Sequence, residues 1–276
     1  MATVVLMAVA SLTALLPSLI PGVMAALDPV SVRAVPAYAL VTGCVLATYL
    51  VFATMLVRVV DRRPITALGL RCDRRAVVAL TAGVAASILV MLAASLAART
   101  MGIGRTVDAA TIEQSAPATA PLAAVLALLL LRSFVLQGIG EEVLFRGYLL
   151  QSLSGRPRLA VLVCAAAFTI PHLISNGGQE GALEHLAYLA PPFGFALSAA
   201  MLWIARHSVW AAIGIHGGFH VSVQLGAALG LMVDGPGTWL LLGAGHIVLA
   251  AVIVLVLPGT RWAEVAARGP YARSES

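Results

Sequence analysis

Hydrophobic runs of about 20 residues recur along the whole chain and are separated by short polar connections. A helix that crosses the apolar core of a bilayer needs about 20 consecutive, mostly apolar residues. The pattern therefore predicts about eight transmembrane helices, with approximate limits 3–27, 36–58, 75–98, 119–139, 158–175, 183–205, 208–232 and 238–257. We expect the fourth to continue as a helix through Leu150, with a bend at Gly138 and Gly140.

The composition agrees with an integral membrane protein of the all-α class. Hydrophobic residues make up 61% of the chain and charged residues 11%, against roughly 25% charge in a soluble domain. No polar segment is long enough to form a separate soluble domain, so residues 1–276 are predicted to form a single membrane domain. The net charge of +5 comes from arginines in short connections between the predicted helices. Such arginines are explained by the orientation of the helices in the membrane, so no nucleic-acid partner is expected. The lipid bilayer is the expected partner.

The charged connections predict the orientation of the helices. Arginines gather in every second connection and in the C-terminal tail, at Arg58, Arg62, Arg63, Arg71, Arg74, Arg75, Arg146, Arg156, Arg158, Arg206, Arg261, Arg268 and Arg273. The intervening connections are neutral or acidic. By the positive-inside rule, both termini are expected on the cytoplasmic side. The chain contains arginine but no lysine, and alanine is abundant. Both features are typical of a GC-rich bacterial genome. The predicted location is therefore a bacterial plasma membrane.

Two adjacent carboxylates follow the fourth apolar run, at Glu141 and Glu142, and Arg146 comes one turn later. Consecutive helical residues point about 100° apart, so the two carboxylates cannot face the same way. Glu142 and Arg146 are spaced i,i+4 and are predicted to form a structural ion pair. Glu141 is then the unpaired acid, and a carboxyl group among apolar side chains is a candidate general base.

Three histidines are predicted to lie on the same side of the membrane as this acid. His172 belongs to the fifth predicted helix, while His216 and His220 lie four residues apart on one face of the seventh. Their distances along the helices from the arginine-rich connections are compatible with one catalytic chamber in the cytoplasmic half of the membrane. Gly214 and Gly218 would let another helix approach the seventh closely.

Two common hydrolase signatures are missing. The zinc-protease sequence H-E-x-x-H is absent, since only Gly217, Gly218 and Phe219 separate His216 from His220. No G-x-S-x-G nucleophile elbow is present either. Serine chemistry is therefore not expected.

The remaining motifs resemble one known family. Glu141-Glu142-x-x-x-Arg146, Phe168-x-x-x-His172 and His216-x-x-x-His220 follow one another in the order and spacing of the CAAX protease and bacteriocin-processing (Abi) family. The resemblance covers about residues 138–220, and we assign residues 117–232 as the catalytic core. The first three predicted helices carry no recognisable signature.

The resemblance implies an intramembrane endopeptidase that hydrolyses a peptide bond of a membrane-anchored peptide or protein. In this family, the positions of Glu141 and His172 activate a water molecule. The last motif polarises the carbonyl group and stabilises the oxyanion, which requires preorganised donors. The candidate catalytic residues are thus Glu141, Glu142, Arg146, His172, His216 and His220.

His220 departs from the family pattern, which usually ends in Asn or Asp. A neutral imidazole donates from one nitrogen only, so oxyanion stabilisation at this position depends on the tautomer. The change also allows a zinc site formed by Glu141, His172, His216 and His220. Family members include metalloproteases and metal-free glutamate proteases. We favour the metal-free interpretation, without a cofactor, because a carboxylate and a histidine suffice to activate water.

Two other functions remain open at this stage. A non-catalytic membrane immunity or interaction protein could retain a degenerate form of the site. A secondary transporter would also place an acid, histidines and proline-broken helices in the membrane, but the two halves of the chain show no convincing internal repeat.

Overall fold

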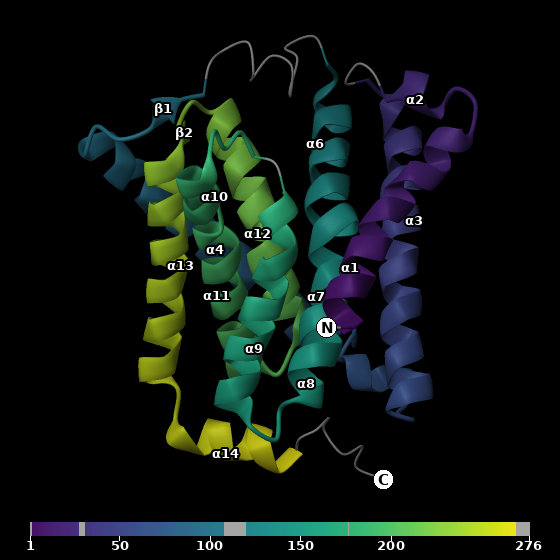
Figure 1. Ribbon diagram of the computed structural model, residues 1–276, viewed down its shortest axis with the longest axis vertical. Helices are drawn as coiled ribbons and strands as arrows, with labels where there is room; N and C mark the ends of the chain where they lie inside the picture. Colours follow the sequence, from purple (N-terminus) through teal and green to yellow (C-terminus); the bar gives the residue numbers. More distant parts are fainter. Residues whose placement is uncertain (1, 28–30, 108–119, 176, 269–276) are drawn as a thin grey trace.

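The computed structural model describes residues 2–27, 31–107, 120–175 and 177–268, and these segments are almost entirely helical (Figure 1). The α-helices are α1 (Ala2–Leu12), α2 (Val23–Ala26), α3 (Ala34–Met55), α4 (Arg74–Thr100), α6 (Leu122–Leu130), α7 (Ile139–Glu142), α8 (Leu150–Ser152), α9 (Pro157–Thr169), α10 (Ala182–Tyr188), α11 (Ala190–Arg206), α12 (Val209–Ala228), α13 (Pro236–Val256) and α14 (Gly259–Arg268). Two short strands, β1 (Arg105–Thr106) and β2 (Val233–Asp234), pair antiparallel with Arg105 opposite Asp234.

Other helical turns continue several of these helices. The 3-10 segments are η1 (Thr13–Leu19), η3 (Ile65–Leu68) and η6 (Ile170–Ile174), and the π-helical segments are η2 (Leu56–Val60), η4 (Leu131–Gly138) and η5 (Val143–Leu149).

Six helical segments in the described part of the chain are long and apolar enough to cross a membrane. They are Ala34–Val60, Arg74–Thr100, Leu122–Ser152, Pro157–Ile174, Ala182–Arg206 and Pro236–Val256. The ends of each segment lie within a few residues of the limits predicted for one helix. The exception is Leu122–Ser152, which continues past residue 139, as expected for this helix. The all-α, membrane-spanning class is thereby supported, but the six segments do not make up the eight predicted spans.

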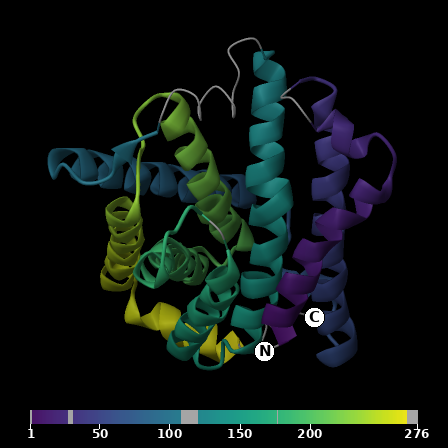
Figure 2. The same ribbon diagram turned by 45° about the horizontal axis from the view of Figure 1, so that its top comes forward.

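The first predicted helix, 3–27, was wrong as a continuous span. The chain forms α1, changes to the 3-10 segment η1 and then makes a turn before α2. Pro17 lies inside η1, and Gly22 has a φ of +83°, a left-handed conformation that ends a helix. The continuous apolar helix Ala2–Pro17 is consequently shorter than the six long segments. It packs against α3, η5 and α9 (Figures 1 and 2).

The seventh predicted helix is present as α12, but it is less apolar than the six long segments. Its sequence contains His216, His220 and Gln224 as well as several glycines. Its N-terminal half is buried between α4, α11 and η4. A helix in this position meets other helices and little lipid, which explains why it can carry polar groups.

Glycines allow α4 and α12 to pack backbone to backbone. A Cβ atom at Gly83 of α4 would lie 2.5 Å from the carbonyl oxygen of Ala211, and one at Gly218 of α12 would lie 2.7 Å from the Cα of Val84. A Cβ at Gly214 would collide with the carbonyl oxygen of Leu80. The close approach predicted at Gly214 and Gly218 is therefore confirmed. The helix that bears the glutamates contacts α12 separately, through η4 and α7.

The fourth predicted helix runs without interruption from Leu122 to Ser152. The two predicted bend positions remain helical, and π-helical segments flank the short helix α7 on both sides. In π-helical turns the hydrogen bonds run from i to i+5, and such turns occur frequently at functional sites. Glu141 and Glu142 thus lie inside a long helix, about 11 residues before its end, instead of just beyond a span.

The helices alternate in direction, so the arginine-rich connections between residues 60 and 74, 152 and 157, and 206 and 209 gather at one end of the bundle together with α14 (Figure 1). The connections at the opposite end contain β1 and β2. This arrangement is the one expected from the charge pattern.

We expect Gly214→Ala to weaken the packing of α4 on α12, because overpacking a close contact costs about 1–3 kcal/mol. The change should lower the midpoint of thermal unfolding of the purified protein in detergent. Gly43→Ala on α3 is a matched control, since a Cβ there meets no atom within 4 Å. Equal midpoints for the two variants would contradict the close packing.

Candidate active site

The centre of the site is a buried network around Glu142. One carboxylate oxygen, Oε1, lies 2.8 Å from a guanidinium nitrogen of Arg146 and 3.0 Å from Nδ1 of His216. The side chains of Glu142 and Arg146 are fully buried, and His216 is 1% exposed. The predicted ion pair at i,i+4 is therefore present, and it extends to a histidine 74 residues further along the chain.

Arg146 is held from three directions. Besides the bond to Glu142, its second terminal nitrogen donates to the carbonyl oxygen of Ala196 on α11 at 2.9 Å. Its guanidinium carbon lies 5.0 Å from the ring centre of Phe168 on α9, a cation–π distance. The arginine therefore joins α9 and α11 to the helix of the glutamates.

Glu141 has the opposite character. Its side chain is 6% exposed, and within the described residues it forms no hydrogen bond or ion pair. It lies within electrostatic range of His216, Glu142 and Arg146. The two neighbouring carboxylates thus differ: Glu142 is fully buried and held through Oε1 by Arg146 and His216, whereas Glu141 is slightly exposed and is held by neither.

His172 uses one ring nitrogen, Nδ1, for a hydrogen bond, which leaves Nε2 available. Nδ1 lies 3.0 Å from the carbonyl oxygen of Phe168 one turn earlier. A carbonyl oxygen can only accept, so Nδ1 carries the proton and Nε2 of the neutral ring is left with a lone pair. Proline at position 171 and the 3-10 turn η6 place this histidine at the end of α9. The ring is half-buried and tilted against that of Phe168.

His220 lies one turn beyond His216, with ring centres 5.2 Å apart. It packs edge-on against Phe219 and lies within electrostatic range of His172 and Arg132. In the described part of the chain, no hydrogen bond fixes its tautomer. The electrostatic neighbours show that the three predicted histidines belong to one region of the bundle.

Aromatic rings form the walls between these groups. The ring of Phe195 on α11 lies 4.9 Å from that of His216, and the ring of Phe168 lies 5.6 Å from it edge-on. The two phenylalanines also contact each other at 5.2 Å. Because apolar rings surround the imidazole, it has little freedom to leave Glu142.

Sequence reasoning missed three contributors to the site. Phe195, the carbonyl group of Ala196 and Tyr49 come from α11 and α3, outside the quoted motifs. Tyr49 is 1% exposed and packs against Gly140, the residue before Glu141. The sequence offered one signal for α11, the pair Pro191-Pro192, which lies in the first turn of that helix. No sequence signal pointed to Tyr49.

The remaining polar residues of the spans have simpler roles. His246 is fully buried and its Nδ1 lies 2.9 Å from the hydroxyl oxygen of Ser198, which agrees with a packing histidine. Arg132 is exposed, and the described residues provide it with no ion pair. An exposed arginine in a span is compatible with a side chain that snorkels toward a polar region.

The alternative zinc site does not find support in this geometry. Among the described residues, no group of three or more His, Cys, Asp or Glu side chains is placed to hold a metal ion. The candidate ligands Glu141, His172, His216 and His220 all lie within those residues. We therefore derive no chemical step through a metal.

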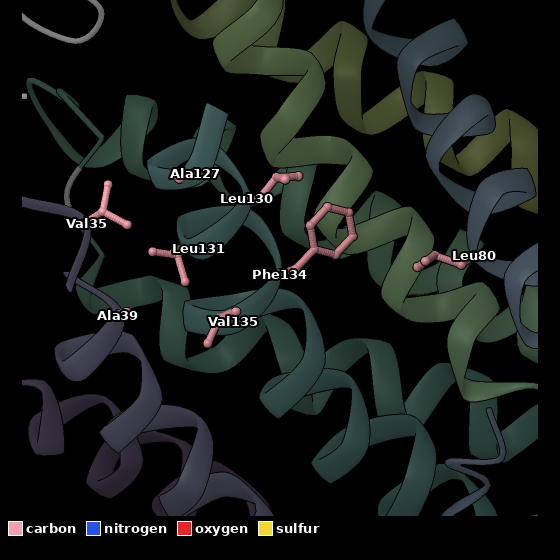
Figure 3. A pocket seen from close by; sticks show the side chains of 8 residues that line it. All are labelled: Val35, Ala39, Leu80, Ala127, Leu130, Leu131, Phe134 and Val135. Atoms are coloured by element: carbon pink, nitrogen blue, oxygen red, sulfur yellow. The ribbon is translucent and has the colours of Figure 1, made fainter. Parts of the chain in front are cut away.

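An apolar groove of about 590 Å³ lies behind the helix of the glutamates (Figure 3). It is lined by Val35, Ala39, Leu80, Ala127, Leu130, Leu131, Phe134 and Val135, from α3, α4 and the Leu122–Ser152 helix. The ring of Phe134 also lies against Gly217, between His216 and His220, where a Cβ atom would collide with it. The groove and the site thus share Phe134 as a common wall.

Residues 123–222 match a family model described as "Rce1-like: Type II CAAX prenyl endopeptidase Rce1-like". The match contains all six predicted site residues and the network around Glu142. This stretch is a domain of the CAAX endopeptidase family. Membership of that family implies a protease. The Rce1-like domain supplies the carboxylates, the three histidines and Phe195, whereas α3 and Tyr49 lie outside the match. No curated protein and no solved structure matches the chain.

We expect Arg146→Met to destabilise the Rce1-like domain strongly. Removing one partner of a buried ion pair leaves the other charge uncompensated, which costs about 3–5 kcal/mol. Thermal unfolding in detergent checks this expectation. Arg261→Met is the matched control, because its pair with Glu264 lies on the surface and such pairs contribute about 0–1 kcal/mol. An equal decrease of the unfolding midpoint in both variants would mean that the buried ion pair stabilises the protein no more than the surface pair does.

Proposed function

We propose that this protein is an intramembrane endopeptidase that hydrolyses a peptide bond of a membrane-associated protein or peptide. The observation that carries the proposal is the division between the two carboxylates. Glu142 is bound through Oε1 by Arg146 and His216, whereas Glu141 is buried beside them and its oxygens form no hydrogen bond with the described residues. A general base needs an available lone pair that water can reach. Oε2 of Glu142 is also without a partner among the described residues, but Glu142 is fully buried and held through Oε1, whereas Glu141 is 6% exposed.

The proposed reaction begins with a water molecule between Glu141 and Nε2 of His172. Glu141 takes one proton, the water oxygen forms a bond to the carbonyl carbon of the substrate, and the π electrons move to the carbonyl oxygen. His172 accepts a hydrogen bond from the water and orients it. When the tetrahedral intermediate collapses, the C–N bond breaks and the proton on Glu141 passes to the leaving amine. Acid and base roles thus alternate on one carboxyl group.

In this proposal, the oxyanion is stabilised from α12. Glu142 holds the ring of His216 through Nδ1, so when that ring is protonated its Nε2–H is a donor in a fixed direction. His220, one turn away, provides a second donor in the tautomer that carries hydrogen on the nitrogen facing the substrate. Fixed donors in a site that excludes water stabilise a developing charge strongly.

The apolar groove supports a substrate that is attached to the membrane. Its lining is entirely apolar, and Phe134 separates it from the backbone of Gly217 in the site. An acyl or isoprenyl chain on the substrate would fill it and would bring the peptide next to the catalytic groups. We further propose that the arginine-rich end of the bundle faces the cytoplasm of a bacterial cell, with both termini on that side.

The non-catalytic alternative is supported by one observation, the lack of a hydrogen bond that fixes the tautomer of His220 within the described residues. A site with this oxyanion donor misplaced would keep its fold and lose its activity. The experiment on Glu141 distinguishes the two functions.

We expect Glu141→Gln to abolish proteolysis, because an amide cannot accept the proton of the attacking water. Peptide termini in membranes of cells that express wild-type or variant protein at matched levels would be compared by mass spectrometry. New termini should appear with the wild type alone and identify the substrates. Glu180→Gln, the same change at an exposed position, should leave them intact. Identical termini from wild type and folded Glu141→Gln would instead favour the non-catalytic function.

Filling the groove should impair substrate binding more than chemistry. We expect Val35→Trp to raise KM for a lipidated substrate about tenfold, which corresponds to about 1.4 kcal/mol of binding, with little change in kcat. Val51→Trp is the control, since Val51 lines a second groove, formed by residues 50–65 and without Phe134. An unchanged KM for Val35→Trp would remove the groove from the proposed binding site.

A further inference from the structure

Tyr49 links the third helix to the catalytic glutamate. Its side chain is 1% exposed and belongs to the main hydrophobic core. A Cβ atom at Gly140 would lie 2.6 Å from Cδ2 of the Tyr49 ring and 2.8 Å from its Cγ. The ring therefore occupies the space that any other side chain at position 140 would need. This contact fixes Tyr49 beside the residue that precedes Glu141.

The hydroxyl group of Tyr49 is a buried donor without a hydrogen-bond acceptor among the described residues. Its polar neighbours are Ser11 on α1, which lies near enough to act as a hydrogen-bond partner, and Glu141, whose charge acts on it. Leaving a buried hydroxyl without a partner is unfavourable, so a position of this kind is expected to serve a purpose. Among the residues that the structure describes, none hydrogen-bonds the oxygens of Glu141, which is buried in the same part of the bundle.

We propose that the hydroxyl of Tyr49 donates a hydrogen bond to one carboxylate oxygen of Glu141 and so positions the general base. The other oxygen of Glu141 then receives the proton of the attacking water. This inference rests on the proposed protease function. It assigns Tyr49 as a positioning residue, because it acts on Glu141 and does not touch the substrate.

The position of Tyr49 in the chain gives the inference a wider meaning. The family match begins at residue 123, whereas Tyr49 lies on α3, about 70 residues earlier. The N-terminal helices would then contribute to catalysis directly, in addition to their packing role. The competing explanation is that the hydroxyl pairs with Ser11 and only joins α1 to α3.

The first test compares kcat and KM of Tyr49→Phe with those of the wild type, with a fluorogenic farnesylated peptide that ends in a CAAX sequence as the probe. Phenylalanine keeps the ring against Gly140 and removes only the hydroxyl. We expect kcat to fall by up to about 100-fold, as for a misplaced catalytic group, with KM little changed. Tyr38→Phe, on the same helix but with Arg132 as its electrostatic neighbour, should retain full activity. An unchanged kcat for Tyr49→Phe would overturn the proposal.

The second test needs no substrate and separates this inference from the proposed function. Two double-mutant cycles are measured by thermal unfolding in detergent, one with Tyr49→Phe and Glu141→Leu and the other with Tyr49→Phe and Ser11→Ala. The proposal expects the effects at Tyr49 and Glu141 to be non-additive, because each substitution removes the same contact. Additive effects with Glu141, together with coupling to Ser11, would show a purely structural hydroxyl and overturn it, whether or not the protein cleaves the probe.

Discussion

The ion pair between Glu142 and Arg146 is the interaction on which the rest of the site depends. Both groups are fully buried, and removing charges from water costs several kcal/mol for each ion unless other bonds replace the lost hydration. Here the replacements come from Ala196, Phe168 and His216, each on a different helix. The requirement to satisfy one buried pair therefore brings α9, α11 and α12 together around the glutamates.

That convergence is possible only because α12 approaches its neighbours closely. Gly83, Gly214 and Gly218 remove the side chains that would separate α4 from α12, and Gly217 allows the ring of Phe134 to lie against α12. Without strong hydrophobic association inside a membrane, close packing of small residues is a main source of helix–helix stability. The packing that stabilises the bundle is thus the same packing that sets the direction of His216 and His220.

The sequence predicted those features that depend on local spacing. The helix predicted at 75–98 is found at Arg74–Thr100, because the thickness of a bilayer sets the apolar length. The pairing of Glu142 with Arg146 followed from one helical turn. Contacts between distant segments, such as Tyr49 with Gly140 or Arg146 with the carbonyl of Ala196, leave no periodic pattern and were missed. The break in the first predicted helix was missed because hydropathy measures only how apolar the side chains are. It does not register that Pro17 lacks a backbone N–H group or that Gly22 adopts a left-handed conformation.

The π-helical segments on both sides of α7 change the direction in which the Leu122–Ser152 helix presents its side chains. Hydrogen bonds from i to i+5 make each turn wider than an α-helical one, so the phase of the helix shifts between Leu131 and Leu149. A helical wheel drawn from the upstream residues assigns the wrong direction to the glutamates. Glu141 is thus rotated independently of the lipid-facing surface, and an insertion or deletion of one residue in η4 would turn it away from the histidines without altering any apolar face upstream.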